Sequence, residues 1–168
     1  MKFLVVVDMQ NDFITGSLGS VDAQKIVEKV ACKVKINAGI TIFTRDTHDK
    51  DYLGTQEGKK LPVLHCVKNT FGWEICDELK PFVSKVVDKP TFGSLNLIDV
   101  IKSYKVEVEE IALCGLCTDI CVISNAMILK AAFPETRIVV YKDCSAGVTK
   151  ESHETALAAM KAVQIEVE

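Results

Sequence analysis

The segment GLCTDICV at positions 115–122 places two cysteines four residues apart, and Cys114 lies directly before it. Thr118 and Asp119 favour the start of a helix, so Cys121 is expected in the first helical turn. Free N–H groups and the positive end of the helix dipole lower the pKa of a thiol at such a position, which favours the thiolate. The pattern therefore makes Cys121 a candidate nucleophile, whereas Cys114 ends an apolar run and is expected to pack in the core.

Two further polar residues follow short apolar runs. Asp8 ends the run in VVVDMQ, and Lys89 lies at the end of VVDK. A carboxylate in a partly apolar setting has a raised pKa that suits a general base, and an ammonium group supplies positive charge beside a nucleophile. Ligands bind at the carboxyl ends of strands in open parallel sheets, so the thiol, carboxylate and amine are expected to converge there. A capping role for Asp8 and a surface position for Lys89 are the alternative interpretations.

Residues 45–70 carry a third set of polar side chains. Asp46 and His48 are separated by one residue and would point the same way in an extended chain. His65 lies at the far end of this segment, with Glu57 between. Such a mixture of nitrogen and oxygen donors suits Zn²⁺, Fe²⁺ or Mn²⁺. A solvated loop without a metal is the alternative interpretation.

The composition excludes several classes of protein. The chain has 168 residues, 48% hydrophobic and 26% charged residues and a net charge of −3, which fits one domain over residues 1–168. The charge gives no basic surface for nucleic acid or an anionic membrane. The apolar run at the N-terminus ends at Asp8, too early for a signal peptide or a membrane span. Seven cysteines is an odd number for a disulfide scaffold, so reduced thiols and a cytoplasmic location are expected.

Short β-branched runs alternate with helical patterns along the chain. This alternation predicts an α/β fold with a parallel sheet covered by helices on both faces. The segment 45–70 has no clear period, and a long loop of this kind is usually functional or disordered. Strands are expected at 2–7, 40–44, 83–87, 110–114, 137–141 and 163–167, and helices at 23–36, 95–104, 120–132 and 150–162.

Taken together, these motifs resemble the isochorismatase-like cysteine hydrolases, and within them the nicotinamidase branch. The resemblance spans nearly the whole chain and follows the family's order. It implies a three-layer α/β/α sandwich with a six-stranded parallel sheet in the strand order 3-2-1-4-5-6. The motifs that carry it are VVVDMQNDF, TRDTHDKDY, LPVLHC, DKPTFGS and GLCTDICV.

The resemblance also implies roles for individual residues. Asp8, Lys89 and Cys121 match the family's catalytic triad. A cis peptide bond is implied between Leu116 and Cys117, and the backbone N–H groups of Cys117 and Cys121 would form an oxyanion hole. The sulfur of Cys117 has no catalytic role in this assignment.

A metal site follows from the same resemblance. Asp46, His48 and His65 match ligands of a divalent metal that contacts the pyridine nitrogen of nicotinamide, with Zn²⁺ expected first and Mn²⁺ or Fe²⁺ as alternatives. The usual further histidine is absent from this chain, and Glu57 is the candidate in its place.

The substrate pocket departs from the family pattern. The usual aromatic residue shortly before the last metal ligand is absent, because the chain reads LPVL there. We expect Phe13, Trp73 and Phe92 to build the pocket for an aromatic ring instead.

The expected activity is hydrolysis of nicotinamide to nicotinate and ammonia through a thioester, as part of NAD salvage in the cytoplasm. The expected partner is a small amide, and a homo-oligomer is left open. One alternative is a hydrolase of the same family for carbamoyl groups or other small amides. A thiol redox module built on Cys114 and Cys117 is disfavoured, because redox pairs lie at exposed helix starts. An inert binding module is disfavoured by the intact set of Asp8, Lys89 and Cys121.

Overall fold

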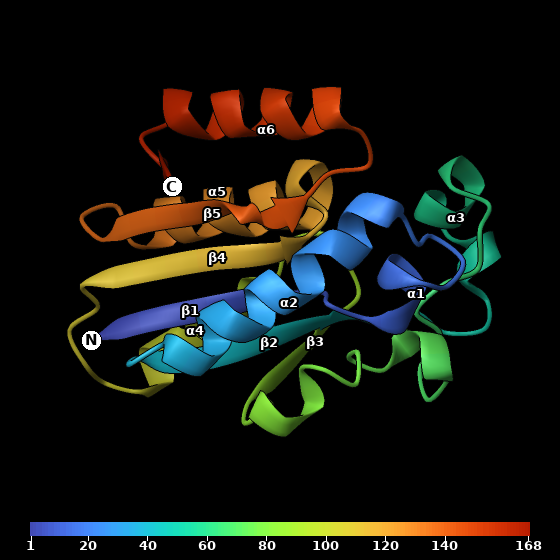
Figure 1. The fold of residues 1–168 in the computed structure, drawn as a ribbon, viewed down its shortest axis with the longest axis horizontal. Coiled ribbons are helices and arrows are strands. Elements are labelled where there is room, and N and C mark those ends of the chain that lie inside the picture. The colour runs from blue at the N-terminus through green and yellow to red at the C-terminus, as the bar shows by residue number, and fades with distance from the viewer.

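The computed structural model describes residues 1–168, which fold around one six-stranded parallel sheet. The strand order is β3-β2-β1-β4-β5-β6, and helices cover both faces (Figure 1). This confirms the predicted layers and strand order. The strands are β1 (Lys2–Val7), β2 (Ile40–Asp46), β3 (Val86–Lys89), β4 (Glu110–Leu116), β5 (Arg137–Ala146) and β6 (Glu166–Val167).

Alternating side chains of the strands supply two separate cores. Leu4 and Val6 of β1 face a core that α2 covers, whereas Phe3, Val5 and Val7 face a core that α4, α5 and α6 cover. Figure 1 shows α2 in front of the sheet and α4 and α5 behind it. The helices are α1 (Asn11–Ile14), α2 (Val21–Ile36), α3 (Gln56–Lys60), α4 (Leu95–Ser103), α5 (Ile123–Ala132) and α6 (Lys150–Ala162).

Several predicted boundaries are wrong. The fifth strand runs to Ala146 rather than ending at residue 141, and the second and fourth strands end at Asp46 and Leu116 rather than at residues 44 and 114. The third strand begins at Val86 rather than at residue 83, because a 3₁₀ turn over Lys80–Phe82 precedes it. The last strand is only Glu166–Val167, because Gln164 adopts a left-handed φ of 66° in the turn after α6. The predicted helix 120–132 is a π turn over Thr118–Val122 followed by α5.

The backbone changes direction where β1 and β4 end. Asp8 has a φ of 48°, a left-handed conformation that aspartate tolerates better than most residues. Gly115 has a φ of 116°, and a Cβ at this position would lie 2.1 Å from the carbonyl oxygen of Val7. Only glycine therefore allows these two strands to run side by side into the turn that carries Cys121.

Residues 45–70 fold back over the carboxyl ends of the strands. This segment contains the short 3₁₀ helix Tyr52–Gly54 and α3, which Thr55 caps by accepting a hydrogen bond from the N–H of Gly58 at 3.0 Å. The segment is therefore more ordered than the sequence pattern predicted. No helix in the structure has both the length and the apolar character that crossing a membrane requires.

Candidate active site

Three side chains from separate strand ends meet in the interior. Nζ of Lys89, at the end of β3, lies 2.6 Å from Oδ2 of Asp8 and 3.5 Å from Sγ of Cys121. Asp8 directly follows β1, and Cys121 lies in the π turn after β4. All three are buried. The structure thus brings together the thiol, carboxylate and amine at the predicted edge of the sheet.

Asp8 has the environment of a proton acceptor. Burial raises its pKa above the usual range, and the charge of Lys89 and a hydrogen bond from Oγ1 of Thr44 to Oδ1, at 2.6 Å, offset only part of this rise. Oδ2 makes no hydrogen bond of regular geometry, although Lys89 is close to it. This oxygen therefore keeps a lone pair for the proton of a neighbouring group.

The environment of Cys121 differs from the sequence prediction. Burial raises its pKa well above that of an ordinary thiol, the charge of Asp8 adds to this rise, and Lys89 opposes it. The predicted thiolate is therefore wrong for the resting site, because burial and the charge of Asp8 outweigh Lys89. Burial alone would lower the pKa of Lys89, but the charges of the carboxylates of Asp8 and Asp46 raise it, so Lys89 stays an ammonium group. A protonated thiol at this position needs a base before it can attack.

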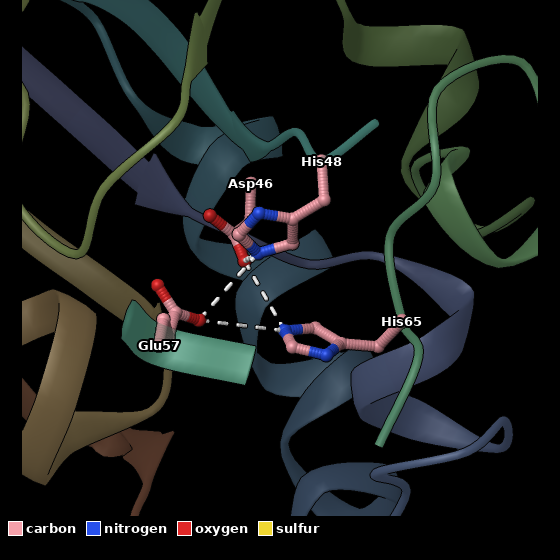
Figure 2. Close-up of side chains that lie close together, drawn as sticks. All are labelled: Asp46, His48, Glu57 and His65. Carbon is pink, nitrogen blue, oxygen red and sulfur yellow. Dashed lines mark hydrogen bonds and ion pairs between the residues drawn. The ribbon is translucent and has the colours of Figure 1, made fainter. Parts of the chain in front are cut away.

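A second cluster lies beside these residues. The side chains of Asp46, His48, Glu57 and His65 point toward one another, with Glu57 extending from α3 (Figure 2). One ligand atom from each lies within 4.8 Å of all the others. Nε2 of His48 is 3.0 Å from Oδ2 of Asp46 and 3.6 Å from Oε1 of Glu57. Nε2 of His65 is 3.6 Å from Oδ2 of Asp46 and 3.9 Å from Oε1 of Glu57.

These four residues fit a divalent metal. Zinc bonds of about 2.0–2.2 Å in a tetrahedron place neighbouring ligands roughly 3.3–3.6 Å apart, close to the four distances between histidine nitrogens and carboxylate oxygens. Nδ1 of His65 lies 2.7 Å from the carbonyl oxygen of Val63, which fixes the tautomer that leaves Nε2 free to bind a metal. Burial raises the pKa of Asp46, but hydrogen bonds with His48 and His65 outweigh burial and hold it below the usual range. Asp46 is thus ionised, as a metal ligand has to be.

Gln10 supports the cluster and was missed in the sequence. Its fully buried amide accepts a hydrogen bond from the N–H of Asp46 at 2.7 Å and donates to the carbonyl oxygen of Asp46 at 2.8 Å. The same amide donates to the carbonyl oxygen of Trp73 at 2.9 Å. The only indication of this role in the sequence is that Gln10 lies two positions after Asp8, close behind an apolar strand.

Tyr52 was also missed. Its ring is buried against His48 and His65, at 4.5 Å and 4.9 Å between ring centres. Its hydroxyl donates to the carbonyl oxygen of Leu61 at 3.1 Å and lies 3.4 Å from Oε1 of Glu57. Burial and the charge of Glu57 raise the pKa of Tyr52 to about 12. No spacing in the sequence pairs Tyr52 with the predicted ligands.

A cavity of about 290 Å³ connects the two clusters. Asp46, Glu57 and His65 line it on one side, and Cys117 and Cys121 line it on another. The remaining wall is mostly apolar, and none of the lining residues is lysine or arginine. The apolar residues include Phe13, Leu18, Leu61, Phe92, Ile120 and Val148.

The structure brings two of the three predicted aromatic residues to this cavity. Phe13 and Phe92 are in its wall, whereas Trp73 is not. The ring of Trp73 lies 3.4 Å from the guanidinium of Arg45, and its Nε1 donates to Oγ1 of Thr47 at 2.8 Å. The pocket role predicted for Trp73 is therefore wrong for this cavity, because a cation–π contact and this hydrogen bond hold the ring elsewhere.

Cys117 lines the cavity at the start of the π turn. The peptide bond between Leu116 and Cys117 is cis, as the resemblance implies. The carbonyl oxygen of Cys117 accepts hydrogen bonds from Ile120 and Val122 at 3.1 Å and 3.0 Å. The oxyanion hole itself stays a prediction.

The other thiols do not form a redox pair. All seven cysteines are free, and Cys114 is fully buried at the end of β4. Burial raises the pKa of Cys114 and raises that of Cys117 to about 12. Neither sulfur has the low pKa and exposure of a redox thiol.

A family model described as the isochorismatase domain matches residues 2–168, which is nearly the whole chain. The chain belongs to the isochorismatase family. The fold, the strand order and the motifs at the strand ends agree with this assignment.

Relatives within the family include amide hydrolases. The chain is 31% identical to the nicotinamidase of Saccharomyces cerevisiae over 53% of its own length and 56% of that protein. It is 25% identical to the pyrazinamidase of Pyrococcus horikoshii, solved in complex with zinc, with a TM-score of 0.82 over 99% of this chain and 98% of the other. It is also 25% identical to the N-carbamoylsarcosine amidase of Thermoplasma acidophilum, with a TM-score of 0.79 over 99% and 95% of the two chains. The nicotinamidase and the pyrazinamidase among these relatives support the predicted nicotinamidase-like branch.

Proposed function

We propose that this isochorismatase family protein is a cysteine-dependent hydrolase of nicotinamide, with nicotinate and ammonia as products. The observation that carries the proposal is the cavity that joins the thiol of Cys121 to the cluster of Asp46, Glu57 and His65. An amide on an aromatic ring can present its carbonyl carbon to Cys121 and its ring nitrogen to that cluster. The named activities of the nicotinamidase and pyrazinamidase relatives support the same assignment.

The first half of the reaction forms a thioester. Asp8 accepts the proton of the Cys121 thiol, and the sulfur attacks the amide carbon. Lys89 balances the negative charge that Asp8 and Cys121 share, since its ammonium lies 2.6 Å and 3.5 Å from their atoms. The N–H groups of Cys117 and Cys121 stabilise the oxyanion. Asp8 then protonates the amide nitrogen, the C–N bond breaks and ammonia leaves.

The second half of the reaction releases the acid. Asp8, again ionised, takes a proton from a water molecule that attacks the thioester carbon. The bond between carbon and sulfur then breaks, and Asp8 returns the proton to Cys121. The product is the carboxylic acid, and both catalytic groups regain their starting states.

The cluster of Asp46, His48, Glu57 and His65 would hold a divalent metal. When bound, the metal would act as a Lewis acid toward the substrate's ring nitrogen and so fix the ring in place. We propose Zn²⁺ first. The two carboxylates also suit Mn²⁺ or Fe²⁺, which prefer harder ligands.

Steady-state ammonia release from nicotinamide and from benzamide, before and after metal removal by a chelator, tests this function. Benzamide has the same amide but no ring nitrogen. We expect nicotinamide to be the better substrate and chelation to raise its KM more than it lowers kcat. Equal hydrolysis of the two amides, unchanged by chelation, would exclude the nicotinamidase assignment.

A carbamoyl hydrolase is the second candidate. The likeness to an N-carbamoylsarcosine amidase favours it, and the same thiol chemistry would serve. However, a carbamoyl amino acid carries a carboxylate, and the cavity wall contains no lysine or arginine to bind one. N-carbamoylsarcosine in the same ammonia assay separates the two, and its faster turnover would favour this second candidate.

We further propose that the reaction serves NAD salvage in the cytoplasm, where free thiols such as the seven of this chain persist. Cell fractionation tests the location. Light scattering of the purified protein measures the oligomeric state.

A further inference from the structure

Asn125 is a fully buried polar residue on α5, in an otherwise apolar stretch of sequence. It lies four residues after Cys121, and its Nδ2 donates to the carbonyl oxygen of Cys121 at 2.8 Å. Nδ2 also donates to the carbonyl oxygen of Phe92 at 3.1 Å, and Oδ1 accepts from the N–H of Ser94 at 3.0 Å. One amide thus connects the turn of Cys121 to a loop more than thirty residues away.

That loop contributes to both parts of the proposed site. It follows Lys89 at the end of β3, and the carbonyl oxygen of Thr91 accepts a hydrogen bond from Nζ of Lys89 at 3.1 Å. Phe92 is part of the cavity wall. A displacement of the loop would therefore move an anchor of the lysine and the aromatic wall together.

The loop packs directly on α5. A Cβ at Gly93 would lie 2.4 Å from Cδ1 of Ile128 and 3.4 Å from Cβ of Ser124, so the glycine allows this close approach. Ser94 directly precedes α4, but its side chain makes no capping hydrogen bond to the helix. Its backbone N–H donates to Oδ1 of Asn125. An apolar residue at position 125 would leave the buried N–H of Ser94 and the partly buried carbonyl oxygen of Phe92 without these partners.

We propose that Asn125 is a positioning residue for the amide hydrolysis, which sets Cys121, Lys89 and Phe92 in one fixed arrangement. This inference rests on the proposed function in one respect, namely that Cys121 is the nucleophile. Asn125 itself does not contact the reacting atoms. It acts through the loop, by keeping the ammonium of Lys89 near the sulfur and the ring of Phe92 in the wall.

Two variants and a matched control test this role. Asn125→Ala removes all three hydrogen bonds. Asn125→Ser keeps a hydroxyl that can donate back to Cys121, as Ser124 already donates to the carbonyl oxygen of Ile120 at 2.6 Å, but it is too short to hold the loop. Asn37→Ala is the control, because it removes amide hydrogen bonds to Thr41 and Gly39 at the opposite end of the sheet.

Three quantities are measured for each variant: the melting temperature, kcat and KM for nicotinamide, and the rate at which iodoacetamide alkylates Cys121. Mass spectrometry of the peptide with Cys114, Cys117 and Cys121 assigns the alkylated sulfur. We expect both Asn125 variants to alkylate Cys121 about tenfold more slowly, with a lower kcat and a higher KM, the scale of one lost buried hydrogen bond. Asn37→Ala should match the wild type in all rates.

A lower melting temperature with unchanged kcat, KM and alkylation rate would overturn the inference, because Asn125 would then be only structural. Wild-type rates in Asn125→Ser would also overturn it, since the loop contacts would then be unnecessary. Should Asn125→Ala fail to fold, Asn125→Ser supplies the measurement. Alkylation of Cys121 is read without any substrate, so this test can fail or succeed independently of whether nicotinamide is hydrolysed.

Discussion

Nζ of Lys89 lies 3.3 Å from Oδ1 of Asp46, whose other carboxylate oxygen faces His48 at 3.0 Å. Asp46 therefore belongs to both clusters, with one oxygen toward the lysine of the thiol site and one toward the metal ligands. Lys89 in turn lies between two buried carboxylates, Asp8 and Asp46. The two sites, which the strand ends bring together, are thus joined through one shared side chain.

Lys89→Met should destabilise the protein as well as inactivate it. The change leaves the carboxylates of Asp8 and Asp46 buried without their common cation, a loss of about 3–5 kcal/mol in the free energy of unfolding. Urea denaturation measures this. The double variant Lys89→Met with Asp8→Asn should recover part of the free energy of unfolding. An equal loss in the single and the double variant would contradict the charge argument.

Asp8→Asn should lower kcat/KM for nicotinamide by at least ~10²-fold, the usual scale of lost acid–base catalysis. The amide is nearly the same size and Lys89 keeps the charge of Asp46 beside it, so the fold should persist, although loss of the buried ion pair with Lys89 should lower the melting temperature. Thr44→Val is a useful comparison, because it removes the hydrogen bond to Oδ1 at 2.6 Å but keeps the base. Near-normal turnover of Asp8→Asn would exclude Asp8 as the proton carrier.

The pH profile should report the raised pKa of Asp8. Only the ionised carboxylate can accept the thiol proton, so kcat/KM should fall as the pH drops through this pKa. Because burial raises it, the acid limb should lie above the ordinary carboxyl value of about 4. Profiles recorded with saturating Zn²⁺ keep metal loss from mimicking this limb. An acid limb at or below the ordinary value would contradict the assigned environment.

Glu57→Gln should weaken metal binding by about 10-fold or more, because the amide has the shape of the ligand without its charge. Competition against a chromophoric zinc chelator measures the affinity. Gln56→Ala, on the exposed side of α3, is the control and should bind as the wild type does. Unchanged affinity in Glu57→Gln would remove Glu57 from the set of ligands.

The sequence predicted the fold and most of the candidate site because both depend on local patterns. Apolar runs identified the strands, and polar residues directly after them identified Asp8, Lys89 and Asp46. Parallel strands bring these ends to one edge, so the convergence followed from topology. Element boundaries such as the start of β3 depended on turns that hydrophobic patterns do not encode.

The parts that were missed depend on tertiary packing. The thiolate expected at Cys121 was wrong because burial, which sequence position does not reveal, raises the pKa of the thiol more than Lys89 lowers it. Trp73 was aromatic and near the predicted ligands, but its partner Arg45 holds it away from the cavity. Gln10 and Asn125 act through hydrogen bonds to residues more than thirty positions away, and no spacing in the sequence marks such partners.

The central claim is that Cys121 is the nucleophile of an amide hydrolase. Ammonia release from nicotinamide by Cys121→Ala and Cys117→Ala, each compared with the wild type, tests it most directly. Binding of nicotinate to both variants is the control for an intact cavity. Cys121→Ala should show no turnover, whereas Cys117→Ala should keep most of the wild-type activity, because only the backbone N–H of residue 117 is needed. Retained turnover in Cys121→Ala, or loss of turnover confined to Cys117→Ala, would contradict the central claim.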